Sequence, residues 1–293
     1  MKILLTNNHL NRPGGSETAC YTLAVELLRQ GHTVDIYAPI KGIVWSKMQE
    51  QGCGWIRPGH YDLAIVSHTP TQKHLMENPH ITIGRMIRVC HGTGNELEQP
   101  FPGADAYVSI SEEVQAHLKA KGYQSTVILN GIDTHRFRRK AEPNRELHKV
   151  LALTQSEKAQ NILEDACRRS GVQLLTLDKF RSPRWDVENA INEADLVISL
   201  GRGALEAMAC ERPVIVWDFR DYQGNMGDGY CYPDLLHDFA KCNFSGRKVR
   251  APMDADDFTR LFRDYWAPDG RELRKWVVEN ANIKIQAKKY LSL

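Results

Sequence analysis

The 293-residue sequence lacks the marks of several protein classes. It has no run of about 18 apolar residues, so no membrane-spanning helix is expected. Its 38 basic and 36 acidic residues leave a formal net charge of +2, which neither demands a nucleic-acid partner nor excludes one. The dinucleotide fingerprint G-x-G-x-x-G is absent, and so is the HExxH pattern of zinc enzymes. The eleven histidines show no paired ligand spacing, so we expect no metal site.

Paired cysteines are missing as well. The seven cysteines are scattered without a CxxC pair, which argues against a disulfide framework or a structural zinc site. Several stand beside apolar runs, as buried free thiols do, and this favours a reducing compartment. Residues 1–5 resemble a short strand rather than a secretory signal, so we expect a cytoplasmic protein.

Short apolar runs alternate with helical stretches along the whole chain. Strand-like runs at 1–6, 33–38 and 62–67 are separated by segments with helical spacing. Near-continuous apolar strands in such an alternation indicate parallel sheets covered on both faces. The sequence therefore predicts an α/β fold of two Rossmann-like domains facing each other across a cleft, with the active site in that cleft.

A charged stretch divides the chain. Residues 138–149 contain Pro143 and lack an apolar period, and the strand–helix alternation restarts after them. We expect an N-terminal, acceptor-side domain over 1–145 and a C-terminal, donor-binding domain over 146–270. The tail at 271–293 has helical spacing and is expected to return to the first domain.

Two glycine pairs follow predicted strands. Gly14 and Gly15 precede a helix, so the backbone can approach a ligand where free N–H groups and the helix dipole favour an anion. Gly201 and Gly203 stand in the same way before a short helix that carries Glu206, whose carboxylate can accept hydrogen bonds from ribose hydroxyls. For each pair an ordinary strand-to-helix turn is the alternative, and acids are favoured near helix starts in any case.

The order of these motifs resembles the family 4 glycosyltransferases, which are retaining enzymes with the GT-B fold. The shared elements run from residue 14 to about residue 216: the first glycine pair, Gly31-His32-Thr33-Val34, Ser109-Ile110-Ser111, Asn130-Gly131-Ile132-Asp133 and Leu205-Glu206-Ala207-Met208-Ala209.

The resemblance implies an enzyme that uses a nucleotide-diphosphate sugar and needs no further cofactor. Lys158 would neutralise the diphosphate as its charge grows, and the backbone at Gly201 and Gly203 would bind the same phosphates. Glu206 would bind the ribose, His91 would lie near the transferred sugar, and Gly14 and Gly15 would line the donor–acceptor junction. A packed or capping histidine is the alternative for His91.

The sequence departs from the family pattern in two places. Leu153 stands where the family usually has an arginine, and Ile198 stands where it usually has a second glutamate that holds the sugar. We expect Arg202 to replace the lost positive charge at the diphosphate.

The predicted reaction is transfer of a sugar to an acceptor hydroxyl with retention of configuration. The first acceptor class is an envelope glycan or a lipid-linked sugar, with peripheral membrane contact. An alternative is a modified base in DNA, which would need a basic groove from residues such as Arg12, Lys41, Lys47, Arg57, Lys73, Arg85 and Arg88. A non-catalytic sugar-nucleotide-binding module, or an epimerase or phosphorylase of the same fold, is a further alternative.

Two other segments of the sequence are not assigned to the predicted site. Asp254-Ala255-Asp256 resembles the metal-binding DxD motif but opens a predicted helix, where aspartates serve as caps. Residues 243–247 form a predicted loop without an assigned role.

Overall fold

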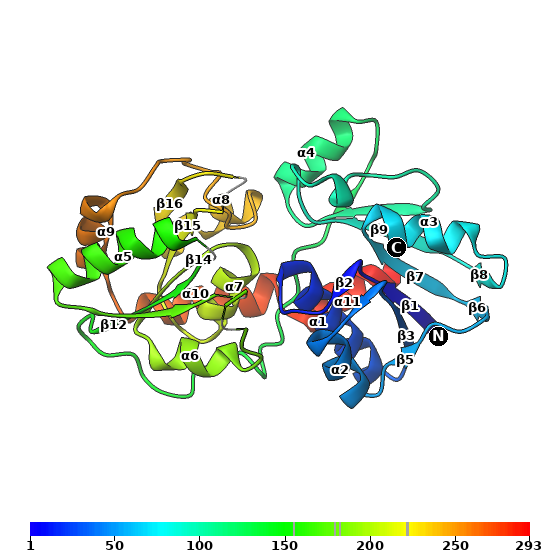
Figure 1. Cartoon of the computed structure of the whole chain (residues 1–293), viewed down its shortest axis with the longest axis horizontal. Helices are drawn as coiled ribbons and strands as arrows, with labels where there is room; N and C mark the ends of the chain where they lie inside the picture. Colours follow the sequence, from blue (N-terminus) through cyan, green and yellow to red (C-terminus); the bar gives the residue numbers. More distant parts are fainter. Residues whose placement is uncertain (155, 179, 182, 221–222) are drawn as a thin grey trace. The chain divides into compact units, whose positions relative to one another are not determined.

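The computed structural model describes residues 1–293 except 155, 179, 182 and 221–222. The chain divides into two compact units. The first unit comprises Met1–Gly131 and Ile283–Leu293, and the second comprises Ile132–Asn282 (Figure 1).

The first unit contains a seven-stranded parallel sheet in the order β11-β10-β9-β7-β1-β3-β5. If the strands of this sheet are numbered in the order in which they occur in the chain, their order across the sheet is that of a Rossmann fold. The direction in which successive strands are added reverses between β1 and β7. The strands are β1 (Lys2–Thr6), β3 (Thr33–Tyr37), β5 (Gly54–Trp55), β7 (Leu63–Ser67), β9 (Met86–Cys90), β10 (Ala106–Ser109) and β11 (Thr126–Val127). Two short pairs flank the sheet, namely β2 (His9–Leu10) with β4 (Ile40–Lys41), and β6 (Gly59–Tyr61) with β8 (Ile81–Ile83).

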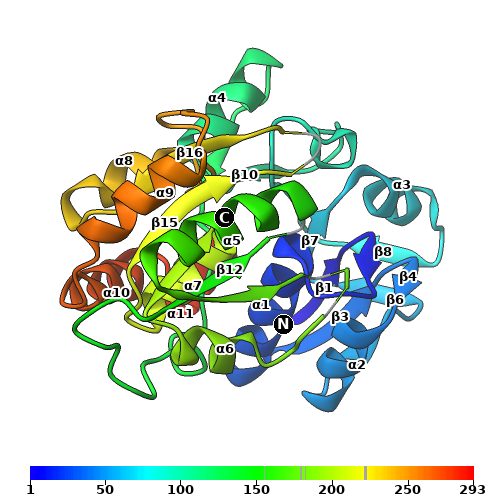
Figure 2. The same cartoon turned by 60° about the vertical axis from the view of Figure 1, so that its left-hand side comes forward.

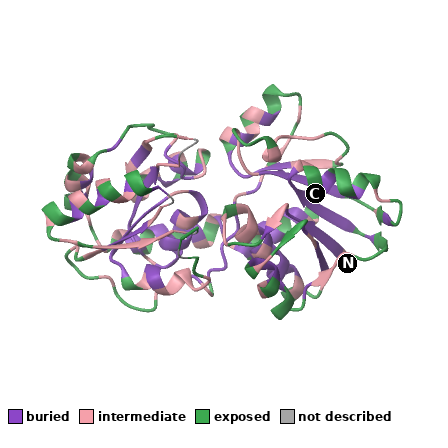
Figure 3. Ribbon diagram, viewed as in Figure 1, coloured by how far each residue is buried: buried purple, intermediate pink, exposed green. Residues whose placement is uncertain are grey.

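Helices cover both faces of this sheet. Leu4, Ala64 and Val66 form a core with Leu75 of the helix α3 (Thr69–Glu77). Leu5, on the other face of β1, lies near the helices α1 (Gly15–Arg29) and α11 (Ile283–Ser292). The remaining helices are α2 (Ile43–Glu50) and α4 (Glu112–Ala120), with one 3-10 turn at Glu96–Glu98. The buried strands and the exposed outer helix faces are visible in Figure 3.

The second unit contains a sheet in the order β13-β12-β14-β15-β16, in which only β16 is antiparallel. Its chain order is that of flavodoxin-like sheets, with the reversal between β12 and β14. The strands are β12 (Lys149–Leu153), β13 (Gln173–Leu177), β14 (Leu196–Ser199), β15 (Val214–Asp218) and β16 (Met226–Tyr230).

Helices α5 (Glu157–Ser170) and α9 (Ala255–Leu261) share a core with one face of this second sheet (Figure 2). The helices α6 (Val187–Glu193), α7 (Gly201–Ala209) and α10 (Asp269–Asn280) lie on the other side in Figure 1. The short helix α8 (Leu236–Lys241) and the 3-10 turns Pro233–Leu235 and Phe262–Asp264 complete the unit. The α/β fold class predicted from the alternation is confirmed.

The division between the units lies before the predicted linker. The charged stretch after residue 138 belongs to the second unit because its backbone is bound there. The Arg212 guanidinium donates to the carbonyl of Ala141 at 2.8 Å, and the Asp195 carboxylate accepts from the Asn144 N–H at 2.9 Å. At the other end of the chain, α10 remains in the second unit and only α11 returns to the first.

Local signals predicted several features that the structure contains. Ser111 caps α4 by accepting a hydrogen bond from the Val114 N–H, and Asp254 forms a capping box with Asp257 at the start of α9.

All seven cysteines are free thiols, and all but Cys242 are buried. Burial raises the pKa of Cys53 to about 12, so this thiol stays protonated at neutral pH. Within the described part of the chain, no helix is both long enough and apolar enough to cross a membrane.

Candidate functional site

In open α/β sheets, ligands bind at the carboxyl ends of the strands where the strand order reverses. Two such places exist in this chain, one in each unit. The first lies between β1 and β7 and is followed by Asn7 and His68. The second lies between β12 and β14 and is followed by α5 and α7. Each unit therefore has its own set of predicted site residues.

The glycine pair of the first unit stands at the N-terminus of α1. Gly14 has extended φ and ψ angles of −143° and 176°, which any residue can adopt, so a positive φ is not the reason for this glycine. A Cβ on Gly14 would lie 2.4 Å from a carboxylate oxygen of Glu17, whereas the space beside Gly15 is open. The chain's own carboxylate thus folds back over Gly14 at the positive end of the helix dipole.

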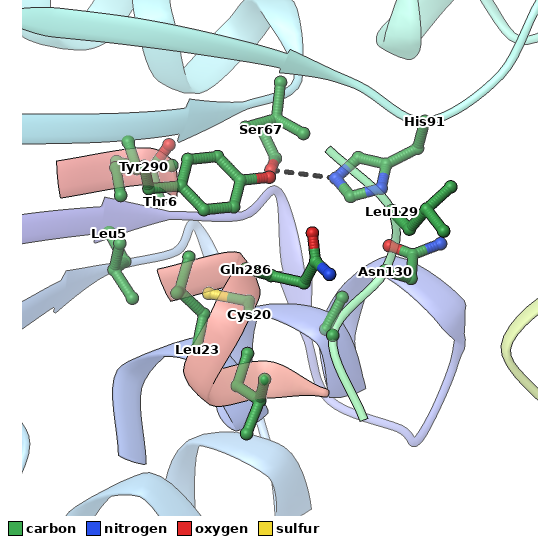
Figure 4. Close-up of a pocket in the computed structure, with 15 residues that line it drawn as sticks. Leu5, Thr6, Cys20, Leu23, Ser67, His91, Leu129, Asn130, Gln286 and Tyr290 are labelled. Atoms are coloured by element: carbon green, nitrogen blue, oxygen red, sulfur yellow. Dashed lines mark hydrogen bonds between the residues drawn. The ribbon is translucent and has the colours of Figure 1, made fainter. Parts of the chain in front are cut away.

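His91 follows β9 at the carboxyl edge of the first sheet. Its Nε2 lies 3.1 Å from the Ser67 Oγ (Figure 4). Both residues line a cavity of about 30 Å³, with Asn130 and Gln286 on its polar side and Leu5 on its apolar side. Such a volume holds about two water molecules and is too small for a sugar ring. The cavity is therefore a small internal space next to His91 and does not itself hold a sugar.

His68, which the sequence analysis did not identify, stands beside His91 at the end of β7. The ring centroids of these two histidines are 6.4 Å apart, and His9 lies 6.5 Å from His68 on its other side. The His68 side chain is buried. Burial, together with His91, Arg88 and His9, lowers the pKa of His68 to about 3, so the imidazole is neutral at physiological pH. The available sequence signal was a polar Ser-His pair directly after an apolar strand.

Arg88 does not contribute to a basic groove. Its side chain is fully buried, and its Nη2 donates to the carbonyls of Leu97 and Gln99 at 2.9 and 2.8 Å. The guanidinium thus anchors the segment that contains the 3-10 turn. The set of basic residues considered for a DNA-binding groove therefore loses this member.

In the second unit, Gly201 and Gly203 form the first turn of α7 rather than a separate turn before it. Gly201 has a φ of +54°, and its N–H donates to the Phe244 carbonyl at 2.6 Å, so this amide is already bound. A Cβ on Gly203 would lie 2.4 Å from the Ser199 Oγ and 3.2 Å from a methyl group of Leu153. Glycine is therefore required at 203, because α7 begins in direct contact with the ends of β14 and β12.

Arg202 and Glu206 form a buried ion pair on α7. The Arg202 Nε lies 2.9 Å from the Glu206 Oε1, and the two side chains are 4% and 10% exposed. Burial is the largest influence on both groups. It raises the pKa of Glu206 and lowers the pKa of Arg202, in spite of their mutual attraction. Two residues that were predicted to bind different parts of a nucleotide therefore bind each other.

Arg136 is a second cation in this region that the sequence analysis missed. It contacts Glu188 at 2.9 Å, and its guanidinium carbon lies 5.0 Å from the ring centroids of both Phe137 and Trp185. Its charge contributes to the pKa shifts of Glu206 and Arg202, which places it near the buried pair. No sequence signal identified it, since the contact with Glu188 spans 52 positions.

Lys158 is an exposed residue in the first turn of α5, directly beyond the end of β12. Since β12 and β14 are neighbours in the sheet, the first turns of α5 and α7 lie at the same edge. The N-terminus of α5 is capped by the Ser156 side chain, whereas no side chain caps the N-terminus of α7, although its Gly201 amide is bound by the Phe244 carbonyl. The end of α7, uncapped by any side chain, is thus the better site for an anion.

Comparison with known proteins gives structural matches alone. No protein-family model and no curated protein sequence matches this chain. Anabaena HepE, solved with UDP, has a TM-score of 0.64 at 14% identity, covering 100% of this chain and 99% of its own. A glycosyltransferase from Rickettsia africae ESF-5 has a TM-score of 0.64 at 13% identity, with coverages of 99% and 97%. MurG from Acinetobacter baumannii has a TM-score of 0.53 at 12% identity, with 100% of both chains covered.

At these identities the likeness concerns the fold. The chain consists of two Rossmann-like α/β units, and its fold is that of the GT-B glycosyltransferases.

Proposed function

We propose that the protein is a glycosyltransferase whose second unit binds a nucleotide-diphosphate sugar at the edge formed by β12 and β14. The observation that carries this proposal is the grouping of Lys158, the uncapped α7 N-terminus and the buried Arg202–Glu206 pair at the point where the strand order reverses. The shared fold with glycosyltransferases supports it.

The chemistry expected here is stabilisation of a departing diphosphate. In the reaction, the bond from the sugar C1 to the diphosphate oxygen breaks and a bond from C1 to the acceptor oxygen forms. The proton of the acceptor hydroxyl is released together with the nucleoside diphosphate. Negative charge grows on the diphosphate, and the Lys158 ammonium and the amides of the first turn of α7 provide positive potential for it. Glu206 would accept from the ribose hydroxyls through its Oε2, while the Arg202 charge opposes the effect of burial on the carboxylate.

We further propose UDP as the nucleotide to test first, because HepE has been solved with UDP and with UDP and glucose. The acceptor in our proposal is a hydroxyl of an envelope glycan or lipid-linked sugar, and the anomeric configuration is retained. The family resemblance supports the retained configuration, and the similarity to HepE supports the choice of nucleotide.

The test is thermal unfolding with UDP, GDP, ADP and CMP and their sugar conjugates, each at saturating concentration. A site filled to about one hundred times its Kd raises the unfolding free energy by roughly 2.7 kcal/mol. One nucleotide should stabilise the wild type, and Lys158→Ala should reduce that stabilisation. Lys275→Ala is the matched control, because Lys275 is also an exposed lysine of the second unit, on α10.

Lys158→Ala is preferable to a Glu206 variant for this purpose. Glu206 is buried in an ion pair, so its replacement by alanine would disturb folding as well as binding. The proposal would be abandoned if no nucleotide stabilises the wild type, or if the two lysine variants respond equally.

A further inference from the structure

An unusual backbone conformation marks His68 at the point where the first sheet reverses. This residue follows β7 and precedes α3, with a φ of 74° and a ψ of 135°. Residues other than glycine rarely adopt such angles, and they persist where the surrounding structure holds them. Strained residues of this kind cluster at functional sites, and here the strain coincides with the switch point between β1 and β7.

Neighbouring hydrogen bonds hold the strained peptide in place. The Thr71 hydroxyl is shared between the Ser67 carbonyl, at 2.6 Å, and the His68 carbonyl, at 3.0 Å. The Gln72 N–H donates to the His68 carbonyl at 3.4 Å. The Thr71 Oγ1 also lies 2.7 Å from the Thr6 Oγ1 at the end of β1. The start of α3 is therefore tied to both strands that flank the switch point.

The hydrogen bonding of the imidazole fixes its tautomer. The Asn8 N–H donates to the His68 Nδ1 at 3.0 Å, so Nδ1 carries a lone pair and the proton is on Nε2. Among the described residues, no acceptor for this Nε2–H is found. The nitrogen is also not one of the buried polar atoms left without a partner, so it keeps contact with solvent.

The groups around His68 suit an uncharged ligand atom. His9 and His91 flank the ring, and the Nη2 of the buried Arg88 donates to the carbonyls of Leu97 and Gln99. A neutral N–H donor fits a hydroxyl oxygen, which can accept from it while donating its own proton elsewhere. A phosphate would instead require a cationic partner to offset its desolvation.

We propose that His68 is a binding residue of the first unit, and that its Nε2–H donates a hydrogen bond to a hydroxyl oxygen of a sugar bound beside His91. This inference rests on the proposed function and adds to it the residue that recognises an uncharged sugar. The hydroxyl in this proposal belongs to the acceptor sugar, which the first unit would bind.

A pair of amide substitutions separates binding from capping. In His68→Asn, the side-chain oxygen replaces Nδ1 and keeps the bond from Asn8, but the Nε2 donor is lost. In His68→Gln, the side-chain amide keeps a donor near the Nε2 position and loses the acceptor for Asn8. Asparagine also tolerates a positive φ better than glutamine does. A capping role predicts that Asn preserves function, whereas our proposal predicts that Gln does.

The variants are titrated with UDP and with free glucose by calorimetry. We expect the UDP affinity to be unchanged in both, because the proposed nucleotide site lies in the second unit. The glucose affinity should fall about tenfold in His68→Asn and remain in His68→Gln. The reverse ranking, or an equal response of the two variants, would overturn the proposal.

A second readout follows the imidazole itself. In the full-length protein with ring-labelled histidine, NMR should show the Nε2–H tautomer of His68 at pH 7. Free glucose should shift the Nε2 resonance, whereas UDP alone should not. If UDP binds but glucose does not move the signal, His68 is only a cap and the inference is wrong. If no nucleotide binds, the proposed function fails first and the inference falls with it.

Discussion

The buried ion pair on α7 gives the strongest test of the energetics. The Arg202 and Glu206 side chains are 4% and 10% exposed and 2.9 Å apart, so solvent screens their attraction little. Burial nevertheless outweighs that attraction, since it raises the pKa of Glu206 and lowers the pKa of Arg202. The ion pair therefore contributes less to folding than its geometry suggests.

Single and double substitutions should behave differently. Arg202→Met or Glu206→Met alone leaves an unpaired buried charge, which should lower the unfolding free energy by about 3–5 kcal/mol. For a unit of this size, that corresponds to a fall in Tm of roughly 6–20 °C. The double variant removes both charges and keeps the apolar stems, so it should lie within about 2 kcal/mol of the wild type.

The assay is a double-mutant cycle by scanning calorimetry at pH 7, with and without UDP. We expect strong coupling between the two substitutions and no stabilisation of the double variant by UDP. If the losses of stability caused by the two substitutions instead add, the two residues stabilise the unit independently. Each would then contribute through contacts other than the ion pair. If the double variant still gains full stability from UDP, the pair lies outside the nucleotide site.

Three further outcomes follow from the structure. Gly270→Ala should lower Tm although alanine favours helices, because its Cβ would lie 2.2 Å from the Glu211 carbonyl oxygen; we expect a cost of about 1–3 kcal/mol in thermal unfolding. Ser111→Ala should cost about 1 kcal/mol through loss of the α4 cap, measured by urea unfolding, and a change below a few tenths would contradict the capping role. The wild type should lose about 2 kcal/mol between pH 7 and pH 5 on account of His68. The unfolded chain takes up that proton below about pH 6.5 and the folded chain only near pH 3, so stability falls as the pH decreases through this window. The same titration of His68→Asn should lack this component.

Local signals explain how much of the fold was predictable. The helix α5 was predicted with its observed bounds, Glu157–Ser170, because Ser156 caps its start and Gly171 adopts a left-handed conformation at its end. The boundary between the units, which we expected after residue 145 and which follows Gly131, was harder to predict from the sequence. It depends on the bonds of Arg212 and Asp195 to a segment about 50 to 70 positions away, and a charged stretch without an apolar period looks like a linker in the sequence.

The candidate site was predictable in location more than in detail. Glycines and polar residues after predicted strands indicated the carboxyl edges of both sheets, because parallel strands end together. The Arg202–Glu206 pairing had a signal in its i, i+4 spacing on a helix, but burial decided that the residues pair inside the protein rather than at its surface. The conformation of His68 had no sequence signal, since the hydrogen bonds around it join α3 to the ends of both β7 and β1, which lie far apart in the sequence.

The two switch points differ in the kind of ligand that they suit. In the second unit, the residues after the flanking strands present a lysine, an uncapped helix end and an ion pair, which together favour a multiply charged group. In the first unit, the α1 N-terminus is covered by Glu17, the Arg88 Nη2 donates to backbone carbonyls, and His68 presents a neutral imidazole with its proton on Nε2. This difference is why we propose that the second unit binds the diphosphate and the first unit a hydroxyl of the acceptor sugar. The UDP and glucose titrations test the two proposals separately.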